Sequence, residues 1–313
     1  MKDGFPMQAD PTFRDHSYLA HEHAYEDYLP GGPKADHARA WLDPHSVNTW
    51  RFHRMYRLAD PLLEACPGAR WLTVGDGRLG MDALYLQARG AQALPTDISD
   101  ALLAVAKARG LLSDYRKENA EALSFADDSF DFVLCKESYH HFPQPMKALY
   151  EMLRVVRQGV LLIEPNDQAC PDSWKTAVSR LLKNLIKKML RRRTDYHDFE
   201  ELGNYVYTIS RREIEKVALG IGLSTVAFKG VNDYYLPGVE FEPAAEHSAL
   251  FRKVRARIAR YDRLCRLGIG QYGLLGAVIL KKRADARVAP ALAAHGFDVV
   301  RLPANPSLSK AQS

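Results

Sequence analysis

Between residues 70 and 165, short apolar runs alternate with helical stretches, and glycines or polar residues mark most of the junctions. We expect strands over 71–74, 92–96, 115–118, 130–135 and 160–163, and helices over 81–89, 99–109 and 145–156. Strands that are separated by helices pair in parallel through right-handed crossovers. This segment therefore predicts an α/β fold, built on a Rossmann-like, doubly wound and mostly parallel sheet.

The remaining sequence predicts helical additions around that sheet. Residues 1–65 are rich in aromatic residues and histidines and predict an N-terminal helical lid. Strands over 224–229 and 273–281 bring the expected sheet to seven strands. We expect one main domain over 66–282, with helical insertions at about 170–205 and 240–268, and then a C-terminal tail or small appendage over 283–313.

Composition excludes several classes of protein. A chain of 313 residues that is 47% hydrophobic can bury a substantial core, and its net charge of +5 does not by itself imply nucleic acid. It has no apolar run of about 18 residues and no apolar signal segment at Met1, so we expect a cytoplasmic protein. The four cysteines form no CxxC pair, and His21 and His23 lack a third ligand, so no metal site is predicted.

The turn that follows the first strand, from Gly75 to Gly80, is spelled GxGxxG and precedes a helix. Glycine allows a sharp turn and close approach of a ligand, and the helix start offers N–H groups and a positive dipole end. These features suit a pyrophosphate or the carboxylate of a methionine moiety, although a plain packing turn has the same spelling. Asp97 ends the second strand, where it can accept from ribose hydroxyls or cap the next helix, as Ser99 also can.

The sequence from Glu118 to Pro145 separates these interpretations. It reads ENAEALSFADDSFDFVLCKESYHHFPQP, and it is followed by ALYEMLRV over 148–155, by Gly159 and by a strand that ends at Glu164 and Pro165. In order and spacing this stretch resembles the class I S-adenosylmethionine-dependent methyltransferases, close to the methyltransferase type 11 group. The resemblance covers residues 70–165 well and the rest loosely. It implies methyl transfer as the activity and S-adenosyl-L-methionine as the cofactor.

The resemblance also implies a cofactor site. Asp97 would bind the ribose, Ile98 would pack on the adenine ring, and Lys136 would present its backbone carbonyl to the methionine ammonium. The complete expected set is Gly75, Asp76, Gly77, Gly80, Asp97, Ile98, Asn119, Ala120 and Lys136.

The glycine turn departs from the family at three positions. Thr73 stands where the family has an acid, Asp76 stands where it has a small or thiol residue, and Leu79 stands near its glycine. We expect Asp76 to assume part of the acidic role.

Methyl transfer to an oxygen often needs a base beside the aligned nucleophile. His140 and His141 follow the fourth strand and Glu164 ends the fifth, so these three are the candidate catalytic residues. For each of them a purely structural role is the alternative interpretation. Aromatic residues are candidates for the lid and for the pocket wall, with packing as the alternative; they are Tyr18, Tyr25, Tyr28 and Trp50 for the lid, and Tyr205, Tyr207, Tyr234 and Tyr235 for the wall.

The cationic helix expected over 174–193 has three interpretations. We favour a lid helix whose charged face is solvated; contact with an anionic membrane surface and binding of an anionic substrate are the others.

Three functions remain after the whole sequence is considered. The first is methylation of a small molecule, without a nucleic-acid partner. The favoured acceptor is an oxygen of a sugar, glycan precursor, polyketide or quinone-like ring, with carbon and nitrogen acceptors as alternatives. The alternatives are a non-catalytic scaffold with the same fold and an NAD-dependent oxidoreductase.

Overall fold

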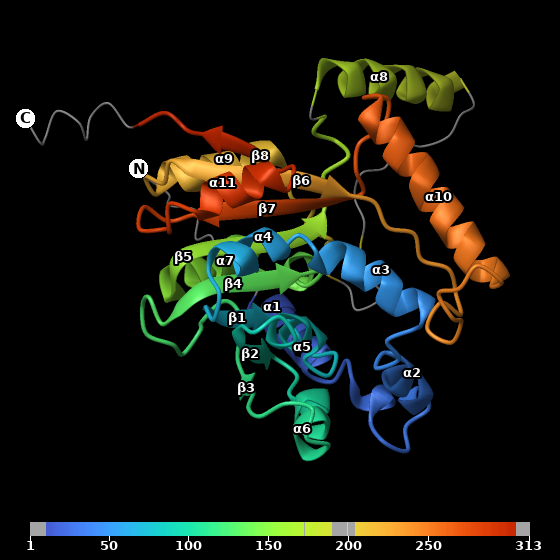
Figure 1. Ribbon diagram of the computed structural model, residues 1–313, viewed down its shortest axis with the longest axis vertical. Helices are drawn as coiled ribbons and strands as arrows, with labels where there is room; N and C mark the ends of the chain where they lie inside the picture. Colours follow the sequence, from blue (N-terminus) through green and yellow to red (C-terminus); the bar gives the residue numbers. More distant parts are fainter. Residues whose placement is uncertain (1–10, 172, 190–198, 200–203, 305–313) are drawn as a thin grey trace, which may run out of the picture.

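The computed structural model describes residues 11–171, 173–189, 199 and 204–304 (Figure 1). The helices are α1 (Pro11–Glu22), η1 (Glu26–Tyr28), α2 (Ala35–Ala40), α3 (Val47–Tyr56), α4 (Asp60–Ala65), α5 (Met81–Gln87), α6 (Ala101–Ala108), η2 (Tyr139–His141), α7 (Pro145–Val155), α8 (Trp174–Met189), α9 (Arg211–Gly220), α10 (Ala249–Arg266) and α11 (Val288–Ala294). The strands are β1 (Arg70–Val74), β2 (Gln92–Asp97), β3 (Arg116–Lys117), β4 (Phe130–Lys136), β5 (Val156–Pro165), β6 (Thr225–Val231), β7 (Leu274–Leu280) and β8 (Asp298–Arg301). Residues 1–10, 190–193 and 305–313 of the expected lid, cationic helix and tail lie outside the described residues.

The described strands form a single sheet in the order β3-β2-β1-β4-β5-β7-β6-β8. Strands β1 to β5 pair in parallel, whereas β7 runs antiparallel to both β5 and β6. The predicted doubly wound α/β fold is therefore confirmed. The count of seven strands is wrong, because β8 from the expected tail adds an eighth strand against β6. Its four residues are too short for their alternation to stand out in the sequence.

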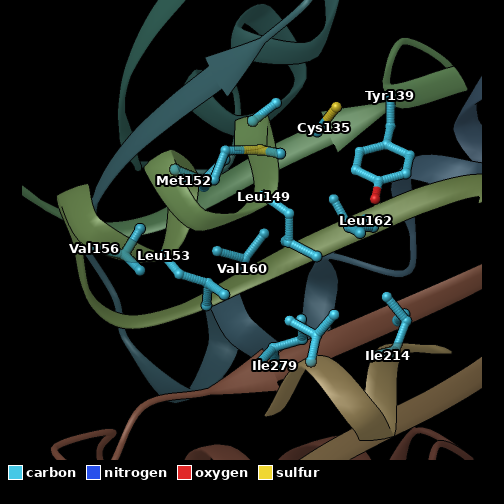
Figure 2. Packing of buried hydrophobic residues seen from close by; sticks show 14 of the residues in the cluster. Cys135, Tyr139, Leu149, Met152, Leu153, Val156, Val160, Leu162, Ile214 and Ile279 are labelled. Carbon is cyan, nitrogen blue, oxygen red and sulfur yellow. The ribbon is translucent and has the colours of Figure 1, made fainter. Parts of the chain in front are cut away.

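Each face of the sheet is covered by its own group of helices. Alternate side chains of β4 and β5, such as Val133 and Val160, pack against α7 and α9 in one core cluster. Figure 2 shows Leu149, Met152 and Leu153 of α7 above β5, with Ile279 of β7 nearby. The intervening side chains point to the other face and meet α3, α4, α5 and α11. A parallel sheet covered on both faces leaves its strand ends as the natural place for a site.

The stretch 47–65 of the expected helical lid forms two helices, and Pro61 lies in the first turn of the second, where proline is well tolerated. The start of α6 differs from expectation. The N-cap of α6 is Asp100, not Ser99. The backbone N–H of Ser99 instead donates to Asp97.

The carboxyl ends of the parallel strands meet the helical additions. Pro165 at the end of β5 pairs with Leu274 at the start of β7, so the segments before α8 and after α10 leave the sheet at this same end. Figure 1 shows α3, α8 and α10 gathered there. In the part of the chain that the structure describes, no helix is both long and apolar enough to cross a membrane.

Candidate active site

The glycine turn is shaped by close contacts that a side chain would block. Gly75 has φ +76°, and a Cβ placed on it would lie 2.2 Å from the Cβ of Ser138. A Cβ on Gly77 would lie 2.4 Å from the Tyr25 ring and 2.8 Å from the Asp97 carboxylate. Leu79 occupies the left-handed region with φ 61° although it is not glycine, and its side chain is buried. The backbone shape typical of a glycine is thus kept at Leu79 at the cost of strain.

Asp76 caps the helix that follows the turn. Its carboxylate accepts from the backbone N–H groups of Asp82 (3.0 Å) and Ala83 (2.9 Å) and from the Thr73 hydroxyl (2.7 Å). Burial, and next the carboxylate of Asp82, raise the pKa of Asp76 well above its usual range. These N–H groups of α5 therefore donate to Asp76. The sequence had suggested that they would be available to a ligand.

Asp97 stands at the carboxyl end of β2, beside the turn. Its carboxylate accepts from Gly77 N–H and Ser99 N–H, each at 2.8 Å. Burial in the cavity raises the pKa of Asp97 to about 6, although these backbone donors oppose the shift. Ile98, Asn119 and Ala120 line the same cavity, and the Asn119 side-chain oxygen accepts from the Glu121 N–H at 2.9 Å.

Lys136 at the end of β4 is buried rather than solvated. Its ammonium lies 3.5 Å from Asp82 and 4.5 Å from the centroid of the Phe52 ring. Its backbone carbonyl, the group expected to face the cofactor, accepts from the Ser138 hydroxyl at 3.1 Å. A carbonyl has two lone pairs, so this bond leaves acceptor capacity.

Glu164 and His140 form a buried pair behind the wall of the cavity. The His140 Nδ1 lies 2.7 Å from the Glu164 Oε2. The other oxygen of Glu164 accepts from the N–H groups of Ser138 and Tyr139, each at 2.9 Å. Glu164 therefore fixes both the loop after β4 and the imidazole on it. The His141 ring lies 4.1 Å from that of His140 and 5.4 Å from that of His21, measured between centroids.

The N-terminal segment lies over the cavity, as a lid would. The Tyr18 hydroxyl donates to Glu121 at 2.6 Å, and burial together with this bond raises the pKa of Tyr18 to about 12. Tyr25 and Tyr28 also line the cavity. Trp50 does not, because its ring packs edge-on against Phe251 of α10.

The cavity has a volume of about 710 Å³. Nine expected site residues line it: Gly75, Asp76, Asp97, Ile98, Asn119, Ala120, Lys136, His140 and His141. Gly77 lies under Tyr25, Gly80 packs against Leu112, and Glu164 lies behind His140, so these three do not. Of the four expected wall tyrosines only Tyr235 lines the cavity.

Several lining residues were missed by sequence reasoning. Arg78 is exposed to the cavity, with its guanidinium carbon 5.3 Å from the centroid of the Trp41 ring and 6.0 Å from that of Phe52. Its side chain hydrogen-bonds to Tyr25, and no carboxylate of the described residues forms an ion pair with it. The position of Arg78 inside the GxGxxG motif could have identified it from the sequence as a cavity residue. No sequence pattern marks Trp41 or Phe52 in this way. Among the described residues, no group of three or more His, Cys, Asp or Glu could hold a metal ion.

The family model described as "Methyltransferase domain" matches residues 72–163. The chain is 32% identical over 171 residues to "Ubiquinone biosynthesis O-methyltransferase" of Hahella chejuensis, covering 51% of this chain and 68% of that relative. It is 35% identical over 131 residues to "Demethylmenaquinone methyltransferase" of Renibacterium salmoninarum, covering 42% and 53%. A solved SAM-dependent methyltransferase of Thermotoga maritima aligns with a TM-score of 0.48 at 16% identity, over 83% of this chain and 99% of that chain.

The chain belongs to the S-adenosylmethionine-dependent methyltransferases. This family membership replaces the oxidoreductase interpretation, which rested on the spelling of the glycine turn alone.

The residues present fit S-adenosylmethionine. The glycine turn keeps side chains away from the wall that Ser138 and Asp97 form, and the carboxylate of Asp97 retains acceptor capacity beyond its two backbone donors. Asn119 and Ala120 lie in the same cavity as Asp97, so one adenosine could contact all three residues.

Proposed function

We propose that this protein methylates a hydroxyl oxygen on a planar ring, with His140 as the general base. The observation that carries this proposal is the 2.7 Å contact between His140 and Glu164 at the wall of a cavity that also contains the glycine turn. When the Nδ1–H of a neutral His140 donates to Glu164, the lone pair of the imidazole is on Nε2. That tautomer is the one a general base needs.

In this proposal the cofactor lies between β1, β2 and β4. Asp97 accepts from the ribose hydroxyls, Asn119 and Ala120 border the adenine, and the Lys136 carbonyl receives the ammonium. S-adenosylmethionine supplies an already activated methyl group when bound. The chain itself aligns the acceptor, excludes water beneath the lid and removes the hydroxyl proton through His140.

Arg78 binds the carboxylate of the methionine moiety in this proposal. The N–H groups of Asp82 and Ala83 are committed to Asp76, whose carboxyl group would repel a second carboxylate when ionised. Arg78 follows Gly77 directly and offers a guanidinium without an ion pair to the same cavity. Guanidinium groups bind carboxylates through two parallel hydrogen bonds.

The acceptor occupies the part of the cavity that α2 and α3 line. Trp41 and Phe52 from this region, with Tyr28 and Tyr235, provide flat apolar surfaces for a ring. The names of the two relatives, which both refer to quinones, support a hydroxylated quinone-type ring over a sugar.

Replacement of His140 by glutamine tests the assignment of the base. We expect kcat to fall by about 10²–10⁴-fold, because proton removal is lost. The affinity for S-adenosylhomocysteine, measured by calorimetry, should stay within about threefold, since the hydroxyl rather than the cofactor depends on the base. Turnover is followed as S-adenosylhomocysteine formed with a panel of catechols, hydroquinones and sugars.

His141→Gln is the matched comparison, because His141 is the next residue and its ring lies 4.1 Å from that of His140, whereas Glu164 contacts the Nδ1 of His140. An equal loss of kcat in both variants would remove the assignment of His140. Turnover of sugars alone would overturn the acceptor class. Cofactor binding without turnover on any acceptor would favour the scaffold interpretation.

A further inference from the structure

Helix α8 is amphipathic, but it turns its apolar side away from the protein. Its large apolar side chains are exposed, from Trp174 (73%) through Leu181 (61%) to Met189 (83%), and Val178, Leu182 and Leu185 are exposed with them. At 100° per residue these six positions fall within an arc of about 100°, a continuous stripe along the helix. A stripe of this kind normally faces a core.

Among the side chains of α8 that the structure describes, those that meet the protein are polar. Thr176 is buried, and the Ser179 hydroxyl donates to the carbonyl of Ile269 at 2.7 Å. The Lys175 side chain lies against Gly268. These contacts fix which side of α8 faces inward, so the exposed stripe is a consequence of how the helix is attached. The expectation of a lid helix with a solvated charged face did not include this exposed apolar stripe.

Positive charge is concentrated in α8 and in the neighbouring α10. The sequence of α8 contains five lysines and arginines and no acid, and that of α10 contains seven with one acid, Asp262. Asp262 is already bonded to Arg54 and Asn232. Arg260, Arg263 and Arg266 are exposed on the half of α10 that approaches α8. Leu267 and Ile269, which follow α10, are exposed as well.

The apolar stripe of α8 and the exposed arginines of α10 together form a surface at the same end of the sheet as the cavity. Glu164, which holds His140, is near the end of β5, and α8 begins ten residues later. Figure 1 shows α8 lying across the end of α10, beyond the carboxyl ends of the strands. The Tyr207 N–H, in the segment after α8, donates to the His140 carbonyl at 3.4 Å. The described segment that follows α8 therefore reaches the loop that carries His140.

We propose that α8 and the carboxyl half of α10 dock on an anionic lipid bilayer. The apolar stripe of α8 enters the boundary between headgroups and acyl chains, and the arginines of α10 pair with lipid phosphates. A nucleic acid matches the positive charge but offers nothing for six exposed apolar side chains. A second copy of this chain matches the apolar stripe but brings the same positive charge, which opposes association. Of these three occupants, the anionic bilayer is the one that satisfies both features.

The experiment is flotation of the full chain with vesicles of phosphatidylcholine, alone or with about a third phosphatidylglycerol. We expect binding to the anionic vesicles, weakened by salt, and little binding to the neutral ones. The double variant Leu181→Asp and Leu185→Asp should lower the partition coefficient at least about tenfold, because it places charges in the stripe. The triple variant Arg260, Arg263 and Arg266→Gln should lower it and flatten its salt dependence.

Ile221→Asp is the matched control, since Ile221 is an exposed apolar residue at the end of α9 and outside this surface. It should bind vesicles as the parent does, and all variants should bind S-adenosylhomocysteine normally. The proposal is overturned if the parent protein does not bind anionic vesicles or if the double aspartate variant binds them as the parent does. It is also overturned if sedimentation shows a dimer that the aspartates dissociate. Vesicle binding needs no turnover, so its failure leaves the proposed chemistry untouched.

Discussion

Asp97 is an acceptor whose charge state changes close to neutral pH. Because burial raises its pKa to about 6, a growing fraction is protonated below that pH and loses acceptor capacity for ribose hydroxyls. We expect the affinity for S-adenosylhomocysteine to be constant above pH 7 and to fall by up to about tenfold for each unit below pH 6. Calorimetry across pH 5–8 measures this.

Asp97→Asn is the control for this pH dependence. The variant should bind S-adenosylhomocysteine more weakly at pH 7, but its affinity should not fall further below pH 6. A fall below pH 6 in the variant would show that another group causes the pH dependence. In the cofactor-free protein the effect on stability has the opposite sign. The raised pKa stabilises the fold below about pH 4, and that contribution is lost as the pH rises through about 6.

Arg78 is the second residue whose role can be isolated, because two ligands differ only in the group it is proposed to bind. Arg78→Met should lower the affinity for S-adenosylhomocysteine by about 10–100-fold, because charge-assisted hydrogen bonds are lost. Its affinity for 5′-methylthioadenosine, which lacks the amino-acid portion, should change by less than about twofold. A parallel loss for both ligands would indicate a disturbed turn, and no loss for either would place the carboxylate elsewhere.

At the scale of the element, α11 joins what was expected to be a tail or small appendage to the core. Val288 and Leu292 are fully buried against α4 and its neighbours, and the chain then returns as β8. We expect Leu292→Ala to lower the free energy of unfolding by about 2–4 kcal/mol, through lost burial and the cavity that remains. Urea denaturation measures the change.

Ala293→Ser is the comparison on the same helix, because Ala293 is exposed. Its effect should stay within about 0.5 kcal/mol. Equal stability of the Leu292 variant and the parent would show that α11 packs too loosely to support β8.

Elements were easier to predict than their surroundings. The alternation that marks β1, β2, β4 and β5 is a local property, so the sequence alone predicted those strands. The orientation of α8 is different: its periodicity defines an apolar side, but contacts such as Ser179 with Ile269 decide which side turns inward. Tyr234 and Tyr235 make the same point, since only the second reaches the cavity.

At the scale of the whole molecule, the sequence predicted which residues share the cavity as far as this follows from strand ends. Asp97, Asn119, Lys136 and His140 each follow or end a strand, and the sheet brings strand ends together. The partners of Asp76 could not be predicted in this way, because they depend on how the turn folds back over the start of α5. Trp41 and Phe52 come from segments before the sheet, and only the packed fold places them opposite the strands.

The two edge strands of the sheet determine how easily another molecule could pair with it. β3 has two residues and β8 has four, so each edge exposes few unpaired backbone N–H and C=O groups. A long open border is a template on which another chain can add a strand, and natural proteins guard against it with short ones. By lying along β6, which has seven residues, β8 replaces a long border with a short one. The last strand of the described chain therefore protects against strand-to-strand aggregation.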